Sequence, residues 1–162
     1  MTLNAFFAPR TSVRPLKHAA RWAMAALMLL AIPAGYCRVV TVDRLEPQEV
    51  SRMSREARAE YEQAVLALDR ILYEEALEHL QATIQLDPEN VRLRFMAVQL
   101  ATYLGDTRWG EDSLTYYGIA IDNLRRMASS PQLNLREQQR AQDAIERLIT
   151  LQQTVLDRDQ SR

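Results

Sequence analysis

The side chains best suited to chemistry are few in this sequence and lie far apart. It contains two histidines, His18 and His79, and one cysteine, Cys37. A lone histidine with no orienting acid or hydroxyl nearby in sequence favours a surface or packing role over acid–base catalysis. A single cysteine forms no internal disulfide, and these three residues lack the spacing of zinc ligands. We therefore expect no catalytic residue, no metal site and no cofactor.

Two pairs of adjacent like charges, Glu74–Glu75 and Arg125–Arg126, are candidate functional groups. Glu74 and Glu75 could in principle form a carboxylate dyad, but adjacent residues of a helix point to different faces. Carboxylates are also favourable in the first turn of a helix, as arginines such as Arg125 and Arg126 are in the last. The four glycines are isolated and form no phosphate-binding loop. The sequence predicts that the protein is not an enzyme.

Apolar residues recur at helical spacing through most of the chain after Ser51. Two helical patterns meet at a break before Tyr73, and the second ends at Pro88, whose ring forbids further helix. Ser54 is a favourable N-cap for the first of these helices. Further helices are predicted over 91–104, 113–127 and 135–156, the first of them ending at Gly105. The only alternating run, residues 39–42, is too short for a sheet, so the fold class is predicted to be all-α.

The stretch from residue 57 to 90 resembles one tetratricopeptide repeat, a helix–turn–helix unit of about 34 residues. Small residues, Ala64 and Ala76, stand where the two helices of that repeat cross, and Leu80 and Pro88 occupy its bulky and closing positions. The sequence departs from the family at three positions of the first helix, Glu60, Gln63 and Ala67. The resemblance implies antiparallel helix–turn–helix repeats in a right-handed stack.

A second, diverged repeat is predicted after the first. Four residues of the first repeat recur with the same internal spacing 37 positions later: Ala76, Leu80, Thr83 and Ile84 match Ser113, Tyr117, Ala120 and Ile121. The last helix has a narrow apolar stripe, which suits a cap on the open end of a stack. We expect the domain to cover residues 53–158 and the tail, 159–162, to fray.

The N-terminal region, residues 1–36, is predicted to direct export. It is basic and free of acids, and the 11-residue apolar run 22–32 is followed by Pro33, Ala34 and Gly35. This order favours an export signal cleaved after Ala34. The run can be extended to 16 residues, so an uncleaved single-span membrane anchor remains an alternative. A lipoprotein signal ending at Cys37 is a third, although Tyr36 is larger than the small residue such signals carry. Residues 37–52 are interpreted as a tether.

The charge distribution argues against a nucleic-acid partner. The net charge is −1, but no acid precedes Asp43. Without the four cations of residues 1–21 the chain keeps 16 cations against 21 acids, about −5. Nucleic-acid binding calls for a basic stripe instead.

The resemblance also implies where a partner would bind. In tetratricopeptide repeats, ligand peptides lie along the inner face of the first helix of each repeat. Carried onto this sequence, that face comprises Arg58, Tyr61, Val65 and Leu68 from the first repeat, with Arg92, Phe95, Gln99 and Thr102 from the second. The mixture suits a peptide with an apolar anchor and an acidic group. Alternatively, these residues pack against the last helix or a neighbouring subunit.

Trp109 is a second candidate for partner binding, because a large aromatic in a polar loop is often an interface anchor. Alternatively it folds back over the crossing of the neighbouring helices. Together these features predict an exported or envelope-anchored, periplasmic module that binds a protein or peptide, with the membrane contacted only through an uncleaved N-terminal segment. The alternative is an obligate structural subunit of a homo-oligomer or envelope assembly whose groove is permanently filled.

Overall fold

The computed structural model describes residues 41–161, which form six α-helices and no β-strand. The predicted all-α fold class is confirmed. The N-terminal segment predicted to direct export or to anchor the chain, residues 1–36, lies outside the described residues. The helices are α2 (Pro47–Arg52), α3 (Arg55–Asp69), α4 (Tyr73–Leu86), α5 (Val91–Thr107), α6 (Glu111–Ala128) and α7 (Leu135–Gln160).

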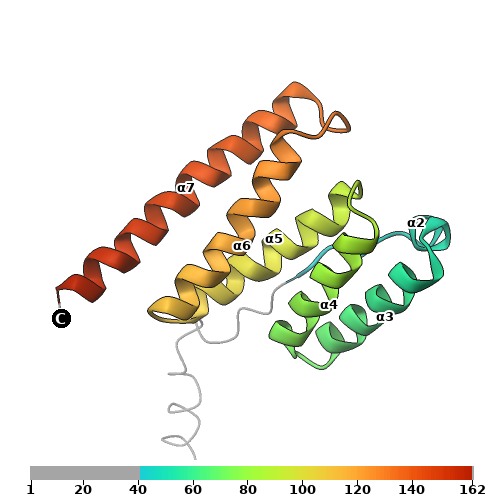
Figure 1. The fold of residues 1–162 in the computed structure, drawn as a ribbon, viewed down its shortest axis with the longest axis horizontal. Coiled ribbons are helices and arrows are strands. Elements are labelled where there is room, and N and C mark those ends of the chain that lie inside the picture. Colours follow the sequence, from blue (N-terminus) through green and yellow to red (C-terminus); the bar gives the residue numbers. More distant parts are fainter. Residues whose placement is uncertain (1–40, 162) are drawn as a thin grey trace, which may run out of the picture. The chain divides into compact units, whose positions relative to one another are not determined.

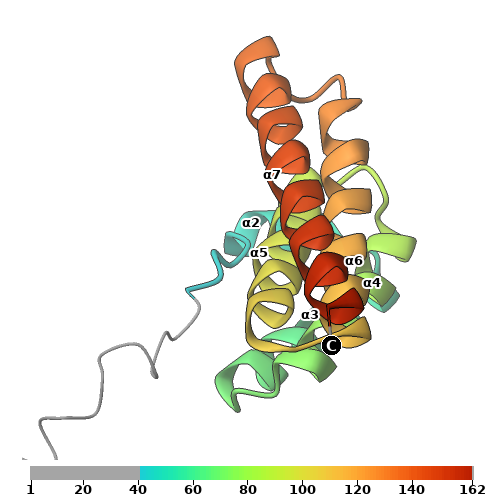
Figure 2. The ribbon, with the colours of Figure 1, turned by 90° about the vertical axis from the view of Figure 1, so that its left-hand side faces the viewer.

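Each helix from α3 onward packs against the next along the chain, so that the bundle consists of neighbouring antiparallel pairs (Figure 1). The connections are short, residues 70–72, 87–90, 108–110 and 129–134. Short connections force successive helices to run in opposite directions. α7 lies beside α6 and closes one side of the bundle (Figure 2). This is the position predicted for a terminal helix.

Side-chain caps fix where several helices begin. The predicted cap Ser54 accepts a hydrogen bond from the Ala57 N–H at 3.0 Å. Asn90 does the same for Leu93 at the start of α5. Asn134 begins α7 with a reciprocal capping box, in which Glu137 bonds back to its main chain. Each cap satisfies main-chain N–H groups that the helix itself leaves unpaired.

The core follows the predicted apolar stripes. Ala64 and Ala76, predicted at the crossing of the first two helices, are fully buried. All eight residues matched between the two helix pairs are also buried: Ala76, Leu80, Thr83, Ile84, Ser113, Tyr117, Ala120 and Ile121. Equal spacing in sequence has therefore produced equivalent burial in α4 and α6.

Three predicted helix ends are wrong. Gly105 does not end α5, which continues to Thr107. A Cβ at Gly105 would lie 2.6 Å from two ring carbons of Tyr117, so this glycine allows α5 and α6 to approach closely instead of turning the chain. α6 begins at Glu111, two residues before its predicted start. α7 continues to Gln160, four residues past its predicted end at 156.

Candidate functional site

The predicted groove between α3 and α5 is filled by the chain's own residues. A non-helical segment, residues 41–46, crosses these helices and leads into α2 (Figure 1). We call this segment the strap. It lies within the predicted tether of residues 37–52, and the described part of that tether is packed against the domain.

Three groove side chains bind the main chain of the strap. The Tyr61 hydroxyl accepts a buried hydrogen bond from the Leu45 N–H at 2.8 Å. The Gln99 side-chain oxygen accepts from the Asp43 N–H at 3.4 Å. Arg92 Nη2 donates to the Arg44 carbonyl at 3.2 Å. α3 and α5 thus pair main-chain groups of three consecutive strap residues, groups that a non-helical segment cannot pair within itself.

One strap side chain enters the hydrophobic core. Leu45 is only 7% exposed, whereas its neighbours in the strap are exposed or half-buried. Val42 packs against the same core from a half-buried position, as do the groove residues Val65 and Leu68. Full burial of a leucine contributes about 1.5–3 kcal/mol. Leu45 is therefore the apolar anchor of the strap.

Charged contacts surround this anchor. Arg92 Nη1 lies 2.9 Å from Glu49 of α2, and Arg44 pairs with Asp69 at the end of α3. Arg58 donates to the main-chain carbonyls of Val50 and Ser51, the last turn of α2. Because these ion pairs are largely exposed, each contributes at most about 1 kcal/mol. They contribute little to stability and mainly fix the position of the strap and α2 relative to α3 and α5.

Burial of Tyr61 raises the pKa of its hydroxyl, and the hydrogen bond from the Leu45 N–H partly offsets this effect. The hydroxyl therefore stays protonated well above neutral pH. A neutral phenol has lone pairs to accept the Leu45 N–H. The pairing between α3 and the strap is for this reason insensitive to pH in the physiological range.

The structure brings together four of the nine residues predicted to bind a partner. Arg58, Tyr61, Arg92 and Gln99 all contact residues 43–51. Val65 lies half-buried in the same groove, and Phe95, 43% exposed, projects from α5 one turn before Gln99.

No protein family, curated protein or solved structure matches this chain.

Trp109 is separate from the groove. It lies in the connection between α5 and α6, and 78% of it is exposed. The alternative that it folds back over the helix crossing is therefore wrong. Trp109 and Arg108 line a hollow of about 320 Å³ that also borders the C-terminal turns of α7. The sequence predicted Trp109 as a candidate separate from the groove, and the fold places it on another surface.

His79 has a partner that its sequence neighbourhood did not reveal. Its Nδ1 lies 2.8 Å from the Glu60 carboxylate, which joins α4 to α3. Glu60 stands 19 positions earlier in the chain, so only the packing of the two helices creates this pair. Within residues 41–161, no group of three or more histidine, cysteine, aspartate or glutamate side chains could hold a metal ion.

Among the described helices, α2 to α7, none is both long and apolar enough to cross a bilayer. The predicted anchor region, residues 1–36, precedes the described part of the chain.

Proposed function

We propose that the protein is a non-catalytic protein-interaction module of tetratricopeptide type, exported to or anchored at the cell envelope. Its α3/α5 groove would hold an extended peptide segment. The observation that carries this proposal is the binding of the strap's main chain by Tyr61, Arg92 and Gln99. The export step rests on the sequence of residues 1–36 alone.

A groove of this kind suits an adaptor. Contacts to main-chain N–H and C=O groups are available to any extended peptide, and a buried side-chain site then selects among peptides. Here the main-chain contacts come from two helices, and the side-chain site is the one that Leu45 fills. Phe95, exposed beside this site, adds a surface of the type that dominates binding energy in interfaces.

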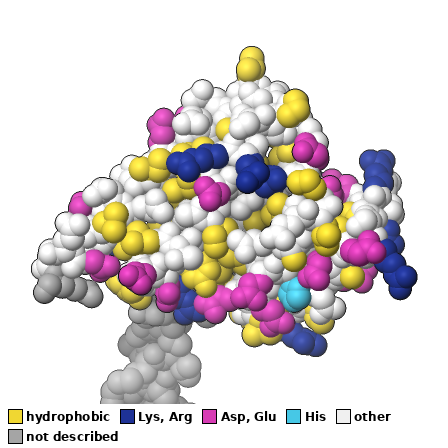
Figure 3. Space-filling view, viewed as in Figure 1, with side chains coloured by type: hydrophobic (Ala, Val, Ile, Leu, Met, Phe, Trp, Pro, Cys, Tyr) yellow, Lys and Arg dark blue, Asp and Glu magenta, His cyan; other side chains and the backbone are white. Residues whose placement is uncertain are grey.

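The surface charge supports a protein partner. Acidic side chains gather along the lower margin of the face shown in Figure 3. Such a margin would repel the phosphate backbone of nucleic acids, which proteins bind through lysine and arginine. It would favour a partner with basic residues outside the segment that enters the groove.

The proposal is tested by site-specific photocrosslinking. A photoreactive phenylalanine analogue replaces Phe95 in the full-length chain in its native cells, and Leu86, 49% exposed on α4, receives the same analogue as a control. We expect a discrete crosslinked protein from position 95 that position 86 does not yield. Adding Arg92→Glu, which reverses a half-exposed groove charge, should abolish it. Equal crosslinking from both positions, or a product insensitive to Arg92→Glu, would refute the proposal.

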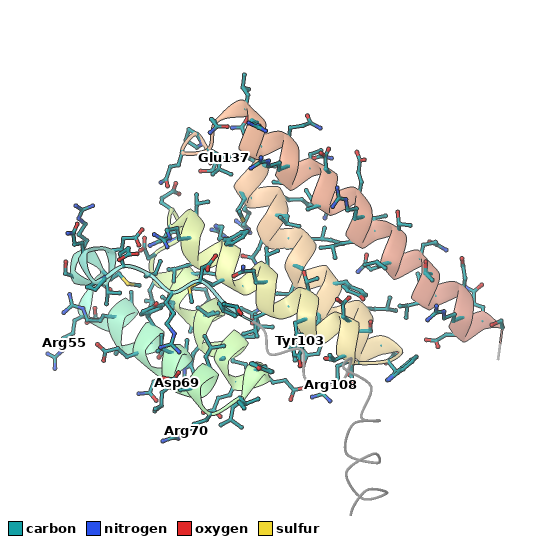
Figure 4. All side chains as sticks on the ribbon, turned by 180° about the vertical axis from the view of Figure 1, so that it is seen from behind. Arg55, Asp69, Arg70, Tyr103, Arg108 and Glu137 are labelled. Atoms are coloured by element: carbon teal, nitrogen blue, oxygen red, sulfur yellow. The ribbon has the colours of Figure 1, made fainter. Side chains whose placement is uncertain are left out.

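A second function is favoured by a different surface. Ile71 adopts a left-handed conformation, with φ of 63°, and exposes 65% of its area. A β-branched residue in this region is strained, and such strain often marks functional segments. Ile71 and Tyr103 line a hollow of about 560 Å³, and Arg108 links it to the hollow beside Trp109. In Figure 4, Tyr103 and Arg108 lie far from Glu137, toward the opposite end of the bundle.

This surface would suit a subunit contact, and thus a structural subunit of an oligomer. Sedimentation and melting of the full-length chain across a hundredfold range of concentration test it. A homo-oligomer requires a melting temperature that rises with concentration. Ile71→Ser with Trp109→Ser should abolish that rise. A melting temperature independent of concentration would exclude the homo-oligomer.

A further inference from the structure

The strap is bound in the manner of a peptide ligand, although it belongs to the same chain. Side chains of α3 and α5 bind three of its main-chain groups, and one side-chain pair, Arg44 with Asp69, adds to these contacts. The strap continues along the chain into α2 and Met53, and Ser54 then caps the start of α3. The helix pairs α3–α4, α5–α6 and α6–α7 pack against one another without it.

The contacts separate into those that any peptide could make and those that need a particular side chain. The hydrogen bonds that Asp43 N–H and Leu45 N–H donate and the one that Arg44 C=O accepts are of the first kind. Burial of the Leu45 side chain and the pairing of Glu49 with Arg92 are of the second. The groove thus recognises an aliphatic residue followed four positions later by a carboxylate.

The strap is held less firmly than the helices. Four of its six residues are exposed, and Leu45 alone is buried. Of its three main-chain hydrogen bonds to α3 and α5, the two to Gln99 and Arg92 lie at exposed positions. Segments with few buried apolar contacts and exposed hydrogen bonds open at lower free energy than the global unfolding reaction. The strap can therefore leave the groove while α3 to α7 stay folded.

We propose that the strap is an intramolecular competitor for the peptide site. The partner is a segment of another protein that is extended up to an aliphatic residue in the place of Leu45 and then turns into a helix, with a carboxylate in the place of Glu49. This inference rests on the proposed function and assigns both the chemistry of the partner and the control of its access. A partner binds only the open fraction of molecules, so the closed strap weakens its apparent affinity by that fraction.

Competition is strong because the strap is tethered. A ligand joined by a short connection has an effective concentration in the millimolar range. A free peptide with the same contacts would not displace it at micromolar concentration. Weakening the anchor of the strap should therefore increase the affinity of the groove for a free peptide.

The test uses a fluorescent synthetic peptide with the sequence of residues 39–53 and the full-length protein. Leu45→Asp places a charge in the apolar anchor site and should release the strap. Leu66→Asp adds the same charge at an exposed position of α3 and serves as the matched control. By fluorescence anisotropy, we expect Leu45→Asp to bind the peptide at least tenfold more tightly than the wild type. Leu66→Asp should behave as the wild type does.

Two further variants locate the binding. A peptide carrying aspartate at its own anchor position should not bind. Adding Arg92→Glu to the Leu45→Asp protein should weaken binding at least fivefold, because Arg92 contacts both the strap carbonyl and the Glu49 carboxylate. Binding that survives both changes would lie outside the groove and would overturn the inference. If Leu45→Asp loses its helical circular dichroism, Leu45→Ser provides the same comparison without a buried charge.

The possible failures are distinguishable. Equal affinity of the peptide for the wild type and a folded strap-released variant overturns competition by the strap but leaves the groove as a peptide site. Absence of binding to both, with the strap shown open by hydrogen exchange, overturns the inference and the proposed function together. Dimers of the wild-type protein that Leu45→Asp dissociates would assign the groove to the strap of a second copy, which overturns the partner proposed here.

Discussion

Replacing Tyr61 by phenylalanine isolates the bond that most firmly holds the strap. The substitution keeps the buried ring and removes only the hydroxyl that accepts the Leu45 N–H at 2.8 Å. A buried donor left without a partner costs about 1–3 kcal/mol. Because the strap can open locally, this cost should appear as easier opening of the strap. The global free energy of unfolding should change less.

Amide hydrogen exchange followed by NMR measures this opening directly. A loss of about 1–3 kcal/mol corresponds to roughly 5- to 150-fold faster exchange at the Leu45 amide. Amides in the middle of α5, such as that of Leu100, should exchange at their wild-type rates. Tyr73→Phe is the matched control. The Tyr73 ring packs edge-on against the Tyr103 ring, with the two ring centroids 5.1 Å apart. The Tyr73 hydroxyl makes no hydrogen bond within residues 41–161.

Two outcomes would refute this reasoning. Unchanged protection of the Leu45 amide in Tyr61→Phe would mean that the hydroxyl does not hold the strap. A uniform loss of protection through α3 to α7 would mean that the strap and helices open as one unit. The second result would also remove the basis for a strap that opens by itself.

Three other predictions test the packing. Leu80→Ala, at a fully buried position, should lower the free energy of unfolding by about 2–5 kcal/mol, as measured by urea denaturation. Leu86→Ala, half-exposed on the same helix, should lower this free energy by under about 1 kcal/mol. Ile71→Gly should raise the free energy of unfolding by up to about 1 kcal/mol, because the relief of left-handed backbone strain exceeds the added entropy of the unfolded chain. A lower free energy of unfolding in this variant would contradict the strain. Burial and the neighbouring Asp106 raise the pKa of Tyr117 to about 12, so subtracting a Tyr117→Phe titration at 295 nm should reveal a phenolate appearing near pH 12. The stability from this raised pKa is complete below pH 10 and is lost as the pH rises toward 12.

Local patterns were sufficient to predict the helices. Apolar spacing located α3, α4 and α5 and predicted the burial of Ala64, Ala76 and Leu80, because these properties depend on the period of one helix. One error occurred where two helices meet. Gly105 has the sequence signature of a helix end, but contact with Tyr117, on another helix, determines its role. A pattern along one helix contains no information on that contact.

The groove was predictable as a surface, whereas its occupant was not. The tetratricopeptide resemblance assigns Tyr61, Arg92 and Gln99 to the inner face of the first helix of each repeat, and this assignment grouped them. The strap bonds they make span 16 to 56 positions of the chain. No local rule connects residues so far apart.

One signal of the strap was present in the sequence. Val42 and Leu45 are aliphatic residues in a segment interpreted as a tether, and both stand between polar neighbours. A tether that only separates two parts of a chain has no need of an apolar residue, since burial of a leucine is what makes ordering of a segment favourable. Leu45 therefore indicated that the segment binds something. The structure identifies its binding site as the groove residues of α3 and α5, since Tyr61, Arg92 and Gln99 bind the main chain of the strap.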